Sequence, residues 1–171
     1  MSFANLLRQR ASFFLPLRTS YLRPAKTLVF MTAQLRILTQ KHEMLPLLPL
    51  IQQLSPGLTL ERYTDLLDDM LAHGYRIVAV FEGELCTGLS GFWVITKIYS
   101  GKYLEMDNVV VDVAHRSKGI GKLMSDFLSD LARREGCEMM MLDAYLENEK
   151  AHAFYEREGF TKRGYHFLKR L

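Results

Sequence analysis

The residues best suited to chemistry form a short loop between an apolar segment and an amphipathic one. Val109 to Val111 predict a strand, and the loop Arg116-Ser117-Lys118-Gly119-Ile120-Gly121 follows it closely. Apolar residues then recur at spacings of three and four, which predicts a helix; they are Ile120, Leu123, Met124, Phe127, Leu128 and Leu131. A loop that opens a helix directs unpaired backbone N–H groups and the positive end of the helix dipole at one point. The stretch therefore predicts an anion-binding site.

The spacing of the glycines excludes two common phosphate-binding loops. A dinucleotide fingerprint, G-x-G-x-x-G, needs a third glycine where Met124 stands. A P-loop, G-x-x-x-x-G-K-[ST], needs glycine in place of Arg116 and Ser or Thr in place of Leu123. The remaining pattern, R-x-x-G-x-G, is weak alone. It gains weight from the segment downstream, where Asn148 predicts the cap of a helix that ends at Gly159.

Together these segments resemble the GNAT superfamily of acetyl-CoA-dependent N-acetyltransferases. The stretch from Leu104 to Glu135 is similar to the acetyl-CoA motif of that family. The segment MMLDAYLENEKAHAFYEREGF resembles the strand and helix that follow, where the family keeps Asn-x-x-Ala-x-x-Phe-Tyr and then Gly-Phe. The resemblance implies an α/β fold with a single domain. Its sheet would be mixed and mostly antiparallel, around the central strand–loop–helix motif.

The resemblance also implies that acetyl-CoA is the co-substrate and that no metal takes part. Backbone N–H groups of the loop would bind the pyrophosphate, and those of the valine strand would bind the pantetheine arm and polarise the thioester carbonyl. Asn148 would cap its helix and also reach toward the cofactor. The expected cofactor-binding residues are Val109, Val110, Val111, Arg116, Ser117, Lys118, Gly119, Ile120, Gly121, Lys122 and Asn148.

Direct acetyl transfer to an amine needs a base, a group that stabilises the oxyanion, and an acid for the departing thiolate. Tyr155 matches the usual general acid of the family. Glu105 and Asp107 are two residues apart on the predicted strand and therefore share one of its faces. The family uses a carboxylate at either position, so both remain candidates for the base, with Glu105 slightly preferred. Asp112 is expected to support the loop rather than to take part in chemistry.

The acceptor amine carries no signature in the sequence. A small-molecule amine and a protein amine both remain open, and a homodimer is possible. The alternative to an enzyme is a non-catalytic acyl-CoA-binding sensor. Nucleic acid is not an expected partner, because the net charge of +3 comes from residues 1–42, which hold seven basic and no acidic residues. No apolar run has the length of a membrane span, so a membrane partner is not expected either.

The chain divides into a basic extension, residues 1–30, and an N-acetyltransferase domain, residues 31–171. The extension is rich in Arg, contains Pro16 and Pro24, and has the composition of an organelle transit peptide. It is equally compatible with an unfolded extension or a mis-called start. We therefore expect a cytoplasmic protein, or an organelle-targeted one if the extension acts as a transit peptide. Cys86 and Cys137 are expected to be reduced thiols without a catalytic role.

The other elements follow from periodicity and from turn residues. Thr59 predicts a helix cap, Gly74 a helix end, and the two prolines at positions 46 and 49 a broken helix. The expected strands are Thr32–Thr39, Tyr75–Phe81, Leu85–Ile98, Glu138–Ala144 and a last one at Thr161–Leu171.

Overall fold

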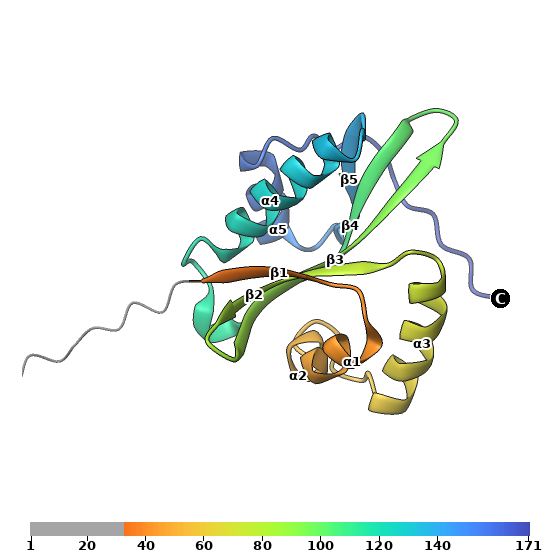
Figure 1. Ribbon diagram of the computed structural model, residues 1–171. Coiled ribbons are helices and arrows are strands. Elements are labelled where there is room, and N and C mark those ends of the chain that lie inside the picture. Colours follow the sequence, from red (N-terminus) through yellow and green to blue (C-terminus); the bar gives the residue numbers. More distant parts are fainter. Residues whose placement is uncertain (1–32) are drawn as a thin grey trace, which may run out of the picture. The chain divides into compact units, whose positions relative to one another are not determined.

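The computed structural model describes residues 33–171, so the predictions for residues 1–30 lie outside the described residues. Within that range the chain forms a five-stranded sheet with helices on both faces (Figure 1). The elements follow in the order β1 (Gln34–Leu38), α1 (Lys41–Met44), η1 (Leu45–Leu47), α2 (Leu48–Ile51), α3 (Leu60–Ala72), β2 (Arg76–Glu82), β3 (Leu85–Lys97), β4 (Gly101–Val111), η2 (Val113–His115), α4 (Ile120–Arg134), β5 (Met139–Leu142) and α5 (Glu149–Arg157).

The strands lie in the sheet in their sequence order, β1-β2-β3-β4-β5. The first three pairings are antiparallel, and only β4 and β5 run parallel, connected through α4. A parallel pair needs such a crossover, whereas antiparallel neighbours need only short turns. The mixed, mostly antiparallel sheet with a central strand–loop–helix unit is thereby confirmed.

Two apolar clusters hold the layers together, one on each face of the sheet. Helices α1 to α3 cover one face and α4 covers the other (Figure 1). On the first face the buried residues include Ile77, Ala79, Leu89 and Val110 with Met44, Leu50, Tyr63 and Leu67. On the second they include Val78, Val80, Phe92, Leu104 and Met106 with Ile120, Met124 and Leu128. Alternate residues of each strand serve opposite faces, as the pleat requires.

Local signals in the sequence set most element boundaries. The Thr59 side chain accepts a hydrogen bond from the Arg62 N–H, so α3 begins where the cap predicts. Gly74, with φ of +85°, follows its end. Prolines 46 and 49 each sit in the first turn of a new element, which divides the first helical region into α1, η1 and α2.

The strand expected at Thr161–Leu171 is wrong, because these residues are exposed and form no strand in the structure. Tyr165, His166 and Phe167 alternate as in a strand, but the segment pairs with no strand among residues 33–171. Strand formation depends on such a partner more than on intrinsic preference. No helix in the described part of the chain is both long and apolar enough to cross a membrane.

Candidate active site

A β-bulge in β4 determines which side chains face which side of the sheet. Gly91 lies opposite Asp107 and Leu89 lies opposite Val110, so a single β3 residue faces both Asn108 and Val109. Asn108 has a φ of +47°, a conformation that asparagine tolerates better than most residues. The extra residue reverses the alternation of the strand.

The reversal places the acidic and the valine residues on opposite faces. Before the bulge, Leu104 and Met106 pack in the α4 cluster, so Glu105 and Asp107 face the α1–α3 side. After the bulge, Val109 and Val111 pack in the α4 cluster, whereas Val110 joins the other one. The prediction that Glu105 and Asp107 share a face is confirmed, since they lie opposite Trp93 and Gly91.

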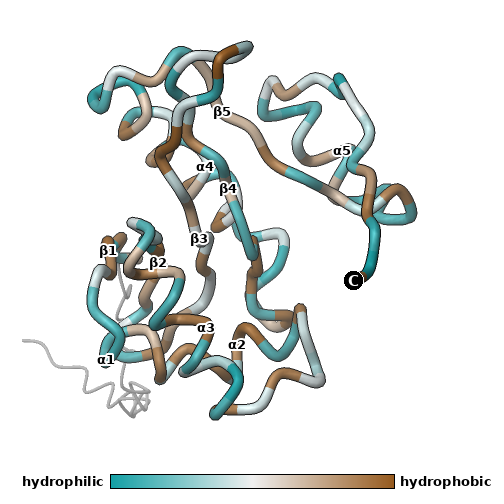
Figure 2. Tube along the Cα trace, turned by 90° about the vertical axis from the view of Figure 1, so that its right-hand side faces the viewer, coloured by the Kyte–Doolittle hydropathy of each residue, from teal (hydrophilic) through white to brown (hydrophobic). Residues whose placement is uncertain are grey.

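Strands β4 and β5 separate at the bulge. Their parallel pairing runs from Tyr103–Met139 to Met106–Leu142 and stops there. Beyond β5 the chain turns away from β4 toward α5, as Figure 2 shows. From Asp107 onward the edge of β4 that faces β5 therefore has no strand partner within residues 33–171. Apart from the Asn108 N–H and the Val111 carbonyl, which bond to side chains, the backbone groups of this edge are available to an extended ligand, as the prediction for Val109 to Val111 requires.

Asp107 lies at this point of separation and is half-buried. Burial raises the pKa of its carboxyl, and the nearby carboxylates of Glu105 and Asp143 raise it further. Hydrogen bonds from the Asn108 N–H and from the Trp93 indole act in the opposite direction. A carboxylate whose proton affinity is increased in this way is a better general base than an exposed one.

Glu105 differs from Asp107 in its surroundings. Its Oε2 accepts a hydrogen bond of 3.1 Å from the Tyr103 hydroxyl. Tyr103 also lies beneath the Lys97 ammonium, 4.9 Å from the ring centroid. Both carboxylates therefore accept hydrogen bonds from protein groups, and Asp107 is the one that stands where the β4–β5 pairing ends.

Sequence reasoning missed two residues next to Asp107. Asn108 donates from its backbone N–H to Asp107 Oδ1 at 2.9 Å and from Nδ2 to Asp107 Oδ2 at 2.6 Å. The Tyr75 hydroxyl oxygen lies 3.5 Å from the same Nδ2. In the sequence, Tyr75 looks like an ordinary apolar residue at the start of a strand, so its position gives no indication of a functional site. The one available signal was Asn108, because asparagine is unusual within a valine-rich strand.

The loop before α4 presents the free donors that an anion needs. No hydrogen bond within residues 33–171 uses the backbone N–H groups of Arg116 to Lys122. Ser117 and Gly119 have φ values of +62° and +84°, which allow the chain to turn into the helix. The pyrophosphate of coenzyme A fits such a set of N–H groups at a helix N-terminus. The loop thus suits the predicted ligand.

Some basic side chains of the loop interact with other protein groups rather than with the anion site at the start of α4. The Lys122 ammonium forms an ion pair with Asp126 at 2.8 Å and lies 3.7 Å from Glu158. The Arg116 guanidinium donates to the Val111 carbonyl at 3.4 Å. Lys122 therefore offers its backbone N–H rather than its charge to an anion at the helix start.

The loop is connected to the α2 segment through Asp112. Its carboxylate accepts from Gln53 Nε2 at 2.8 Å and from the Ala114 N–H at 3.0 Å, and it lies 2.7 Å from His115 Nδ1. The Gln53 amide oxygen accepts in turn from the Val113 N–H. Gln53, followed by His115, lowers the Asp112 pKa to about 2. These contacts hold the turn that directly precedes the loop, and the supporting role expected of Asp112 stays a prediction.

Replacing Asp112 with alanine is expected to weaken acetyl-CoA binding roughly tenfold, because several hydrogen bonds that hold the turn directly before the loop are lost together. Titration calorimetry with acetyl-CoA measures the change. Asp130→Ala is the control, since this exposed aspartate pairs only with Arg133 on the surface of α4. Equal affinities for the Asp112 variant and the wild type would contradict the loop's dependence on this carboxylate.

Helix α5, which carries Tyr155 and is capped by Asn148, packs against the start of α4 through Phe154. The Phe154 ring lies 3.1 Å from the position that a Cβ on Gly121 would occupy, so the glycine permits this approach. Tyr155 packs edge to face against Phe154 and Phe160. Burial raises the pKa of its hydroxyl to about 12, so the group is protonated at neutral pH and can donate. Asn148 accepts from the Ala151 N–H at 3.2 Å, which confirms its capping role.

Neither cysteine is an activated nucleophile. Burial raises the Cys86 pKa to about 11 and also raises that of Cys137. The thiolate form, which is the reactive one, is therefore scarce at neutral pH. Among residues 33–171 there is also no group of three or more His, Cys, Asp or Glu side chains arranged to hold a metal ion.

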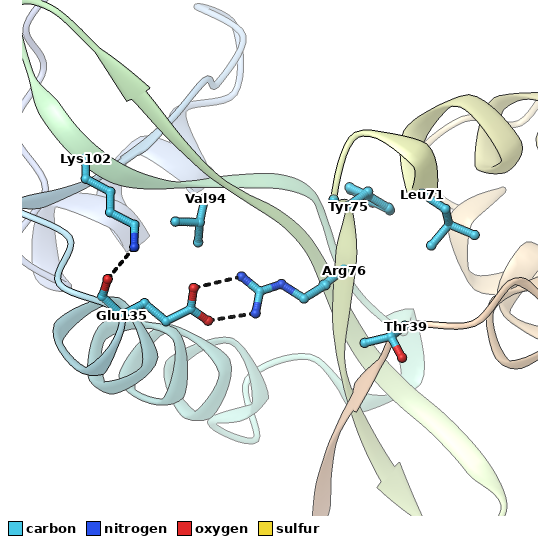
Figure 3. A pocket seen from close by; sticks show the side chains of 8 residues that line it. Thr39, Leu71, Tyr75, Arg76, Val94, Lys102 and Glu135 are labelled. Carbon is cyan, nitrogen blue, oxygen red and sulfur yellow. Dashed lines mark hydrogen bonds and ion pairs between the residues drawn. The ribbon is translucent and has the colours of Figure 1, made fainter.

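Two surface hollows, of about 540 and 490 Å³, contain none of the predicted site residues. In the first, the Arg76 guanidinium donates to both Glu135 oxygens and Lys102 donates to the Glu135 carbonyl (Figure 3). This ion pair links β2 to the end of α4. The second lies between α1, α2 and the sheet and reaches Gln53 and Asp112. The residues predicted for the site therefore line neither hollow, and only Tyr75, which lies beside Asn108, lines the first of them.

Comparison with known proteins gives consistent results. Residues 45–160 match the model of the acetyltransferase (GNAT) family. The N-acetyltransferase YhdJ of Bacillus subtilis is 32% identical over 134 residues, which cover 77% of this chain and 94% of that protein. The structure of glucosamine-6-phosphate N-acetyltransferase from Arabidopsis thaliana superposes with a TM-score of 0.64 at 24% identity, covering 81% and 98% of the two chains. That of aminoglycoside N-acetyltransferase AAC(6')-Iy in complex with CoA superposes with a TM-score of 0.70 at 17% identity, covering 84% and 99%.

Proposed function

The chain belongs to the acetyltransferase (GNAT) family, and from that membership we propose that it transfers the acetyl group of acetyl-CoA directly to a primary amine. The proposal depends most on the position of Asp107. This half-buried carboxylate stands where β4 leaves β5, on the strand that continues into the valine segment and then the loop. A base and a binding site for the acetyl donor thus lie on the same strand.

The donor would bind on the α4 side. The pyrophosphate would accept hydrogen bonds from the N–H groups of Arg116 to Lys122, and the pantetheine arm would lie along the unpaired edge of Val109 to Val111. A backbone N–H of this edge would polarise the thioester carbonyl. Arg116 and Lys118 would add positive charge near the phosphates, and Asn148 would lie at the margin of the site.

In the proposed reaction the Asp107 carboxylate takes a proton from the ammonium form of the acceptor, directly or through water. The free amine attacks the thioester carbon, the C–N bond forms, and the tetrahedral intermediate collapses with cleavage of the C–S bond. Tyr155 donates a proton to the departing thiolate and regains one as the amide nitrogen loses its second. The products are the amide, the CoA thiol and one proton, with no covalent enzyme intermediate.

The surroundings of Asp107 favour a small cationic amine as the acceptor. The charged groups that act on its carboxyl, Glu105 and Asp143, are both acidic. Trp93 supplies a half-buried aromatic ring on the same side of the sheet, and such rings attract cations. A protonated amine arriving at this face would therefore meet carboxylates and the Trp93 ring.

An assay of free CoA thiol, with acetyl-CoA and a panel of amines, tests the proposal. The panel contains diamines, polyamines, amino sugars, glucosamine 6-phosphate and a lysine peptide. We expect turnover with cationic small amines and less with the phosphorylated sugar, which would face the carboxylates. Acetyl-CoA binding without turnover on any amine would instead favour the non-catalytic sensor.

A further inference from the structure

Tyr75 is buried beside the proposed base although it belongs to a different strand region. It precedes β2, is only 3% exposed, and its ring centroid lies 4.9 Å from that of Trp93. The ring crosses β3 above Gly91, where any Cβ would overlap it. The missing side chain at position 91 thus leaves the space through which the Tyr75 hydroxyl reaches β4.

The carboxamide of Asn108 lies between this hydroxyl and Asp107. Its Nδ2 donates one hydrogen to Asp107 Oδ2 at 2.6 Å, and its second hydrogen points to the Tyr75 oxygen at 3.5 Å. The Asn108 backbone N–H holds the other carboxylate oxygen at 2.9 Å. A side-chain amide nitrogen carries two hydrogens, and here each has an acceptor, Asp107 for one and Tyr75 for the other. These two contacts together fix the orientation of the Asn108 side chain.

We infer that Tyr75 and Asn108 are positioning residues that hold the Asp107 carboxylate in its ionised, acceptor-facing orientation. The inference rests on the proposed function, in which Asp107 is the base. The bulge supplies Asn108 with a backbone conformation from which its N–H and its side chain both reach the same carboxylate. Tyr75 keeps the carboxamide from rotating away.

The charges around Asp107 explain why such support is needed. Glu105 on β4 and Asp143 after β5 both disfavour its ionised form, and burial does so more strongly. Tyr75 and Tyr63 are the nearby phenols, and burial raises the pKa of each well above the usual range, so they remain neutral. Asp143 lies 2.8 Å from His166 Nδ1, which is its own partner. The donors from Asn108 therefore oppose burial and both neighbouring carboxylates.

Asn108→Gly is the sharpest test, because glycine keeps the positive φ and the backbone N–H and removes only the carboxamide. We expect the Asp107 carboxyl to titrate about 1 pH unit higher, since a hydrogen bond to its charged form is lost. Carbon-13 NMR of labelled aspartate measures this without any turnover. With an active amine, the acidic limb of the kcat/KM profile should move to higher pH by the same amount.

Tyr75→Phe should move the titration in the same direction by a smaller amount. Tyr63→Phe is its matched control, because Tyr63 is also buried but its hydroxyl donates to the Met44 carbonyl at 3.2 Å. The inference is overturned if Asn108→Gly titrates like the wild type or if Tyr63→Phe shifts the titration as much as Tyr75→Phe does. A shifted titration in a protein that acetylates no amine would refute the proposed function and leave the positioning role intact.

Discussion

Asp107→Asn is expected to lower kcat/KM for the best amine by roughly 10²- to 10⁴-fold at pH 7, the usual contribution of a general base. Asparagine keeps the size of the side chain and can still contact Asn108, but it cannot accept the proton of the ammonium group. The measurement is the initial rate of CoA thiol release across a pH series. Acetyl-CoA affinity should stay within about twofold, because the carboxylate faces away from α4 and the loop.

The pH dependence has a definite sign. The raised pKa of Asp107 means that wild-type activity falls as pH decreases through that value, because the protonated acid cannot act as a base. The same shift means that the folded state loses stability as pH rises through it, since ionisation of a half-buried carboxyl is unfavourable. The pH–activity profile of Asp107→Asn should therefore show no decrease at acidic pH that depends on residue 107. At pH 7 this variant should unfold at the same temperature as the wild type or at a higher one.

Glu105→Gln is the matched comparison, on the same face of the same strand. It should retain most of the kcat of the wild type, because the Tyr103 hydroxyl can still donate to the glutamine oxygen. If Glu105→Gln abolishes turnover and Asp107→Asn preserves it, the assignment of the base is reversed. Glu105 was slightly preferred from sequence, and only the surroundings of the two side chains favour Asp107.

Tyr155→Phe is expected to lower kcat by roughly 10²-fold or more while acetyl-CoA still binds, because the variant keeps the ring and loses only the proton donor. With a pKa of about 12, the hydroxyl stays protonated throughout the working pH range. Deprotonation of Tyr155 should therefore cause no decrease of kcat on the alkaline side of the pH profile below about pH 11. Rapid-quench measurements on saturated enzyme isolate the chemical step.

Tyr145→Phe serves as the control for this variant, because Tyr145 precedes the same helix and is 83% exposed. Its turnover should equal that of the wild type. A Tyr155→Phe enzyme that turns over within twofold of the wild type would show that water or another group protonates the thiolate. Unfolding temperatures of the two variants should be similar, since neither substitution removes a ring contact.

The sequence predicts well those features that depend on residues near one another in the chain. The caps at Thr59 and Asn148 and the helix start after Gly119 all follow from short-range hydrogen bonds. Local chemistry is sufficient for such features.

Features that depend on the pairing of strands cannot be predicted from the sequence in the same way. The bulge at Asn108 exists only relative to β3, where Ser90 faces two residues. Tyr75 reaches Asn108 only because Gly91, sixteen positions away, has no side chain. The order of residues in the chain does not reveal which residues of neighbouring strands lie opposite one another. A site formed by several strands is therefore recognised only in the folded sheet.

The reversal of side-chain direction at Asn108 has a kinetic consequence. Because it places Asp107 on one face of β4 and Val109 and Val111 on the other, the sheet acts as a partition between the two proposed substrates. The donor would enter from the α4 side and the acceptor from the α1–α3 side, and the two would meet only where the pairing of β4 with β5 ends. Neither entrance would obstruct the other. Such an arrangement favours a ternary complex over a ping-pong cycle, and each product could leave by the route its precursor used.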